Sequence, residues 1–183
     1  MFEVFEAGRS PLRIARVSAF VALGVVSGLA LSSIPNVELV TVICFAAGYL
    51  LGLTAGLATG ALVELLFAGF HPMGSSMGFL LFAQMAGMAG AGLVGAVVRR
   101  PAEAAPRGVY LGLLAAAALL CTAWFDLLTN LAYPVSIGFA GIDLRVYFAA
   151  ALPFAAIHLL SNLAVFLVIA APLLPRLRKA LNW

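Results

Sequence analysis

Residues 37–70, VELVTVICFAAGYLLGLTAGLATGALVELLFAGF, are too apolar to face water and too long to form one membrane-crossing helix. As a single helix they would extend about 50 Å at about 1.5 Å per residue. The hydrocarbon core of a bilayer is only about 30 Å thick. The stretch GLTAG at 52–56 therefore predicts a turn between an apolar segment at 37–51 and another at 55–70.

The composition of the whole chain excludes most other classes of protein. Of 183 residues, 64% are hydrophobic and 9% are charged, whereas a soluble domain has about 25% charged residues. So few charges cannot cover a soluble surface, and a soluble enzyme or a disordered chain is excluded. Cys44 and Cys121 fall inside apolar segments, so we expect neither a disulfide nor a metal site.

The apolar pattern extends outward from residues 37–70 into further segments. The first apolar run follows Glu3 and Glu6, which do not suit a signal peptide, and we interpret it as a retained helix. Later runs end near Pro101 and Pro134, because a proline disfavours helix in the residue before it. We expect an all-α polytopic membrane protein, one domain over 1–183, with six transmembrane helices in one bundle at 14–31, 37–51, 55–70, 77–98, 109–133 and 146–174.

Basic residues gather at alternate ends of these segments. The loops between spans one and two, three and four, and five and six hold only Arg145. By the positive-inside rule, both termini then lie in the cytoplasm. The other nine basic residues form three clusters: Arg9, Arg13 and Arg16; Arg99, Arg100 and Arg107; Arg176, Arg178 and Lys179.

Polar residues inside the spans are the candidate functional residues, because such groups are costly in a bilayer and usually face an interior. Asp126, Asn130 and Tyr133 share one helix face, as do His158, Ser161 and Asn162. Together with Glu64 and Gln84 they lie in the half of the bundle away from the basic clusters. We interpret them as a pocket for a small polar ligand, the alternative being hydrogen bonds that hold the helices together.

Enzyme chemistry has weak support in the sequence. Residues 74–78, GSSMG, fit G-x-S-x-G without the preceding strand that this motif requires. An intramembrane hydrolase with Ser76 as nucleophile and His158 as base is therefore only an alternative, as is a non-transporting membrane scaffold. No phosphate-binding loop occurs, so we do not expect this chain to hydrolyse ATP. We also expect no cofactor and no catalytic residue.

Small residues recur at spacings of four, which lets helices approach closely. Glycines occur at 48, 52, 56 and 60, and we expect Gly52 and Gly56 to form the turn rather than a packing stripe. In the first span, Ala15 with Ala19 and Ser18 with Ala22 form faces for another helix, either in this bundle or in a partner.

Several stretches resemble the substrate-binding S components of energy-coupling factor (ECF) vitamin transporters. They are IPNVELVT at 34–41, AGYLLG at 47–52, FDLLTNL at 125–131 and LPF at 152–154, which leads into His158 and Asn162. The resemblance covers nearly the whole chain in size, span count and order.

This resemblance implies a membrane-embedded subunit of an ABC importer that captures a vitamin or related micronutrient in a bacterial or archaeal plasma membrane. It implies a transmembrane coupling protein and two cytoplasmic ATPase subunits as partners. It further implies that the coupling protein docks on Ala15, Ser18, Ala19 and Ala22. It also implies that the first outer loop, with Asn36, covers the site. The metal-specific relatives carry a histidine next to the initiator, whereas this chain begins Met1-Phe2, which disfavours nickel or cobalt. The expected substrate-binding residues are Asn36, Glu64, Gln84, Asp126, Asn130, Tyr133, His158 and Asn162.

Overall fold

A computed structural model describes residues 11–181, and within them every regular element is helical. The all-α fold predicted from the sequence is confirmed. Arg9, a member of the first basic cluster, lies outside the described residues. The helices are α1 (Pro11–Leu31), α2 (Val40–Leu51), α3 (Leu53–Gly69), α4 (Gly78–Ala104), α5 (Arg107–Ser136), α6 (Leu144–Val165), the π-helix η2 (Phe166–Ala170) and α7 (Ala171–Leu181).

Four helices are long and apolar enough to cross a membrane: α1, α4, α5 and the continuous run from α6 into α7. The chain is therefore a membrane protein by the length and composition of its helices. Helices α2 and α3 are also apolar, but their 12 and 17 residues fall short of the about 20 needed for a full span.

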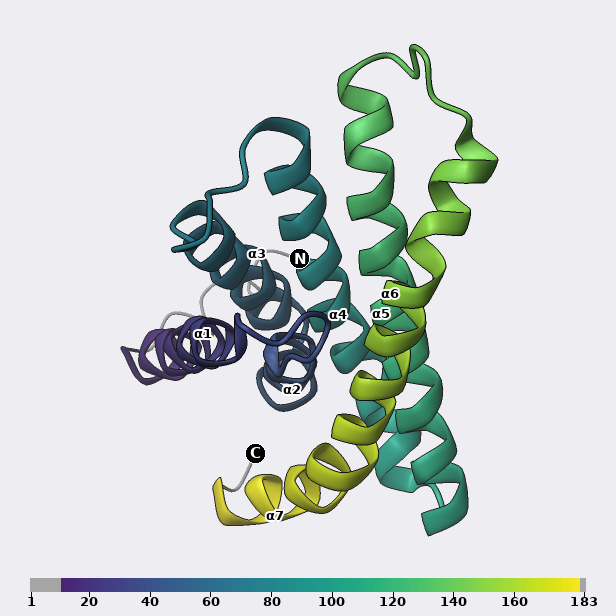
Figure 1. Cartoon of the computed structure of the whole chain (residues 1–183). Helices are drawn as coiled ribbons and strands as arrows, with labels where there is room; N and C mark the ends of the chain where they lie inside the picture. Colours follow the sequence, from purple (N-terminus) through teal and green to yellow (C-terminus); the bar gives the residue numbers. More distant parts are fainter. Residues whose placement is uncertain (1–10, 182–183) are drawn as a thin grey trace, which may run out of the picture.

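The helices are arranged around α4 (Figure 1). Helix α5 packs on one side of α4, and α6 packs against α5 and also contacts α2. Helices α2 and α3 pack on the other side of α4, and α1 packs against both of them. Helix α7 leaves the line of α6 and turns toward α2 at the lower edge of the view (Figure 1).

Glycines allow α2, α3 and α4 to touch backbone to backbone. A Cβ added to Gly48 would lie 1.8 Å from the carbonyl oxygen of Gly92, and one added to Gly56 would lie 2.6 Å from Cα of Gly48. Gly52 forms the single-residue break between α2 and α3 with a positive φ of 91°, as expected for the turn. The expectation for Gly56 was wrong, because it lies inside α3 and belongs to the packing contact.

Two helices continue past prolines at which the sequence analysis ended them: α4 includes Pro101 and α5 includes Pro134. Helix α7 likewise contains Pro175. A proline close to a helix end removes one backbone hydrogen bond, and packing against neighbouring helices compensates for that loss in membrane proteins.

Basic residues gather at one end of the molecule, which we call the basic end. This end is formed by the C-terminal ends of α2 and α4, by the start of α5, and by α7. Its basic residues are Arg99, Arg100, Arg107, Arg176, Arg178 and Lys179. Arg13 of α1 joins this end, since it donates a hydrogen bond to Thr54 beside the α2–α3 break. Asp126 lies about 28 Å further along α5 than Arg107, at about 1.5 Å per residue.

Candidate functional site

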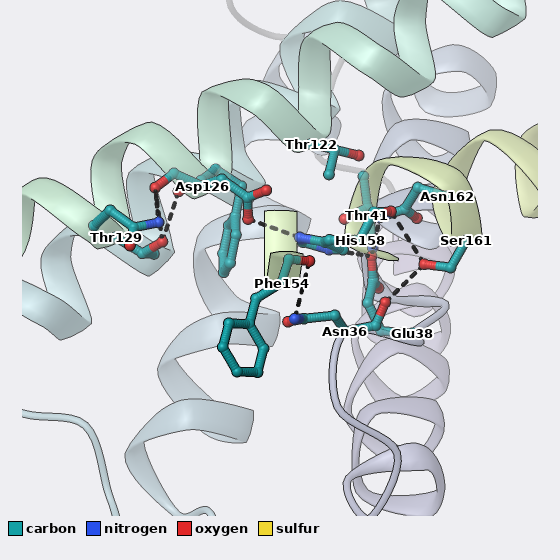
Figure 2. A network of polar contacts seen from close by, with 12 residues as sticks. Asn36, Glu38, Thr41, Thr122, Asp126, Thr129, Phe154, His158, Ser161 and Asn162 are labelled. Atoms are coloured by element: carbon teal, nitrogen blue, oxygen red, sulfur yellow. Dashed lines mark hydrogen bonds and ion pairs between the residues drawn. The ribbon is translucent and has the colours of Figure 1, made fainter. Parts of the chain in front are cut away.

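His158 of α6 lies between two carboxylates contributed by distant parts of the chain (Figure 2). Its Nδ1 is 2.7 Å from Oδ1 of Asp126 on α5, and its Nε2 is 3.4 Å from Oε1 of Glu38 in the loop before α2. The side chain is almost fully buried, and Phe125 packs edge-on against its ring. Since carboxylates only accept hydrogen bonds, an imidazole that donates from both nitrogens satisfies this geometry.

Glu38 connects α2 and α6. Its Oε1 accepts a 2.8 Å hydrogen bond from Nδ2 of Asn162, and its Oε2 accepts a 2.8 Å hydrogen bond from the backbone N–H of Thr41. Burial acts to raise the pKa of Glu38, but the hydrogen bonds from His158 and Thr41 outweigh it and hold that pKa below the ordinary 4.5. Glu38 is therefore a carboxylate at neutral pH.

The loop at 32–39 is fastened over this network by Asn36. Its Nδ2 donates to the carbonyl of Phe154 at 3.1 Å, and its own carbonyl accepts from Oγ of Ser161 at 2.7 Å. Both partners lie on α6, on either side of His158. Asn36 has a positive φ of 59°, a conformation that asparagine tolerates better than most residues.

Two cavities adjoin His158. The smaller, of about 190 Å³, lies toward α1, α3 and α4 and is lined by Glu64, Phe67 and Met88 among others. The larger, of about 470 Å³, lies between α5 and α6 and is lined by Asp126, Asn130 and Tyr147 among others. The two cavities share four lining residues: Pro35, Asn36, Phe125 and His158. The larger volume lies within the about 300–1,000 Å³ that is usual for ligand pockets.

Buried oxygens without hydrogen-bond donors occur beside each cavity. Oε2 of Glu64 and Oδ2 of Asp126 are both buried and have no partner in the described part of the chain. Oδ1 of Asn162 and Oε1 of Gln84 share this property. All four atoms accept hydrogen bonds, so a molecule that meets them must supply donors.

The other expected binding residues take different positions. Asn130 lines the larger cavity, but its Nδ2 donates to the backbone carbonyl of Asp126 at 2.7 Å. Gln84 lines neither cavity. Tyr133 also lines neither, is 57% exposed, and stacks on Tyr147.

Glu38 and Thr41 are site residues that the sequence analysis missed. Residues 37–51 were interpreted as one span, which placed Glu38 at the edge of a helix rather than in a covering loop. The available signal was a carboxylate in the loop between two apolar segments, next to Asn36, which was already a candidate.

The geometry of this network differs from that of a metal site and from that of the Ser76–His158 hydrolase. Asp126 and Glu38 meet opposite nitrogens of His158, so their oxygens do not converge on one point, and the described residues contain no His/Cys/Asp/Glu group able to hold a metal. Ser76 lies in the loop after α3, where its N–H donates to the carbonyl of Ala68, and it lines neither cavity beside His158.

Helix α1 presents two different faces. Gly24 and Gly28 are buried against Val63 and Phe67 of α3. The four small residues expected at a docking face, namely Ala15, Ser18, Ala19 and Ala22, are all exposed. They are therefore not buried by any helix that the structure describes.

Comparison with known proteins adds no relative: no protein-family model, no curated protein and no solved structure matches this chain.

Proposed function

We propose that this chain captures a small polar solute within the membrane, at the network of Glu38, Asp126 and His158. One observation carries the proposal: each cavity beside His158 is lined by an acidic residue, Glu64 or Asp126, that has a buried carboxyl oxygen with no donor in the described chain. A buried acceptor without a donor costs free energy. A solute with N–H or O–H donors, or with a positive charge, would remove that cost.

The wider role follows from the resemblance of residues 34–41, 125–131 and the His158–Asn162 segment to ECF S components. The chain acts as the substrate-capture subunit of an ECF-type importer for a vitamin or related micronutrient. A transmembrane coupling protein and two ATPase subunits supply the energy, and the exposed small residues of α1 dock on the coupling protein. The subunit resides in the plasma membrane of a bacterium or archaeon.

The orientation follows from the separation of charges. The basic end faces the cytoplasm, because Arg and Lys accumulate on that side of membrane proteins. The two cavities beside His158 then lie in the outer half of the bundle, where an extracellular solute arrives. The loop at 32–39, fastened by Asn36, acts as the cover of the site.

The proposal is tested by identifying the small molecule that the purified protein carries. We expect denatured wild-type protein to release one solute in fixed proportion to the protein, as measured by mass spectrometry. Asp126→Asn should release far less, because it changes the carboxylate beside the larger cavity. Glu103→Gln makes the same chemical change at the basic end and should release as much as wild type. Equal release by Asp126→Asn and wild type would reject the site.

A further inference from the structure

A third cavity, of about 1070 Å³, lies at the basic end, remote from His158. Four cationic side chains line it, from α5 and α7: Arg107, Arg176, Arg178 and Lys179. The remaining lining is largely apolar and includes Leu111, Leu167 and Pro172. The cavity therefore combines concentrated positive charge with a hydrophobic wall.

Within residues 11–181, most of this positive charge is not neutralised. Among those residues, Glu103 is the one acidic member of the lining, and it is paired with both Arg99 and Arg178. Arg107, Arg176 and Lys179 make no ion pair with any part of the chain that the structure describes. An anion entering the cavity would meet three cations and little opposing charge.

Tyr49 of α2 supplies an independent sign of a ligand. It is only 2% exposed, yet it lines the cavity, and within residues 11–181 its hydroxyl has no hydrogen-bond partner. Tyr110, which lines the same cavity, does have one, since its hydroxyl donates to the carbonyl of Ala171 at 2.9 Å. A buried tyrosine hydroxyl usually has a partner, so Tyr49 is a donor available to an occupant.

Helix α7 places this cavity at the boundary of the membrane. The helix is amphipathic, with Leu174 buried and Arg176 and Lys179 exposed, and it turns aside from the line of α6 (Figure 1). Amphipathic helices rich in Lys and Arg lie in the plane of the headgroups and attract anionic lipids. Free phosphate would use the cations alone, whereas a phospholipid would also use the apolar wall.

We propose that the cavity at the basic end binds an anionic phospholipid. The phosphate lies against Arg107, Arg176 and Lys179 and accepts a hydrogen bond from Tyr49, and the first carbons of the acyl chains lie along Leu111 and Leu167. This site is separate from the network around His158 and does not depend on the solute proposed to bind there.

The test uses the full chain in nanodiscs of equal parts phosphatidylglycerol and phosphatidylcholine, with the retained lipids identified by native mass spectrometry. We expect wild type to retain phosphatidylglycerol in preference to phosphatidylcholine. Each cation removed should weaken this retention about fivefold, so Arg107→Gln with Arg176→Gln should abolish the preference. Arg100→Gln removes a charge at the same end but outside the cavity, so this variant should keep the preference for phosphatidylglycerol.

Two further measurements keep the result decisive. Tyr49→Phe removes only the hydroxyl and should reduce the amount of phosphatidylglycerol retained, even if the double variant does not fold. Excess inorganic phosphate should leave phosphatidylglycerol bound, because phosphate does not use the apolar wall. The proposal would be overturned by equal retention of both lipids by wild type, by full displacement with phosphate, or by phosphatidylglycerol retention that is unchanged in both Tyr49→Phe and the double variant.

Discussion

His158 has a carboxylate at each ring nitrogen, and this determines what the neighbouring residues do. Asp126 and Glu38 hold the ring from α5 and from the loop before α2, so the ring cannot turn without losing a hydrogen bond. Asn162 adds a second hydrogen bond to Glu38. Two acceptor oxygens of this network, Oδ2 of Asp126 and Oδ1 of Asn162, remain without a donor in the described chain, and Asp126 lines the larger cavity.

Glu38→Gln should destabilise the protein, because it removes the negative charge opposite His158 and Asn162. We expect a loss of about 1–3 kcal/mol at neutral pH, seen as a lower midpoint of thermal unfolding in detergent. Since the folded-state pKa of Glu38 is lowered, its contribution is complete above pH 4.5 and is lost as the pH falls through the lowered value. The difference between the two proteins should therefore shrink under acid. Equal midpoints at neutral pH would show that Glu38 does not hold the loop.

Some side chains of the network around His158 were named from the sequence, and others were not. Periodicity placed Asp126 on one face of its helix and placed His158 and Asn162 together on one face of another helix. The structure brings these two faces together. Glu38 was missed, because the path of a loop over a bundle is not encoded in any periodicity. Gln84 and Tyr133 have helical positions of the same kind, but tertiary packing directs them away from both cavities.

At the scale of the elements, the contact of α2 and α3 with α4 depends on the absence of side chains. Gly48, Gly56 and Gly92 meet where any Cβ would collide with backbone, which cannot move as a flexible side chain can. Spacing in the sequence indicated Gly48 and Gly56, but it did not show whether these glycines form a turn or a packing contact. Helix ends were harder to predict, since Pro101 and Pro134 lie inside helices that packing extends past them.

Gly48→Ala should destabilise the bundle, because the added methyl would lie 1.8 Å from the carbonyl oxygen of Gly92. We expect a cost of about 1–3 kcal/mol from overpacking, measured as a lower unfolding midpoint. Gly112→Ala on α5 is the matched control, since its Cβ would meet no atom within 4 Å. An equal midpoint for Gly48→Ala and Gly112→Ala would contradict the close contact.

The exposed face of α1 leads to a separate prediction that rests on the proposed partner. Ala19→Trp should reduce co-purification with the coupling protein and leave solute binding intact, because Ala19 is exposed and distant from both cavities. Leu120→Trp on the exposed side of α5 is the control for adding bulk. Normal co-purification of Ala19→Trp would remove this face from the account.

Considered as a whole, the molecule separates its polar groups by kind. Acidic and hydrogen-bonding residues gather around His158, and Arg and Lys gather at the basic end, about 28 Å away along α5. This separation was apparent in the sequence as clusters at alternate span ends. A pocket was also expected from the sequence, but the number and volumes of the cavities were not, because these depend on how the helices pack.

The proposed orientation can be measured with single cysteines, since the native Cys44 and Cys121 are buried. A membrane-impermeant maleimide added to intact cells should label Ser75→Cys, in the exposed loop after α3. It should label Ala104→Cys, at the end of α4, only after the cells are opened. The reverse pattern would place the cavities beside His158 on the cytoplasmic side.

The central claim, that a solute binds beside His158, is tested most directly by the affinity of the released solute for two matched variants. Isothermal titration of solute-free protein should show that Asp126→Asn weakens binding at least about tenfold, the loss of roughly one charge-assisted hydrogen bond. Glu103→Gln, altered at the basic end, should bind as wild type does. Equal affinity of Asp126→Asn and wild type would contradict the account.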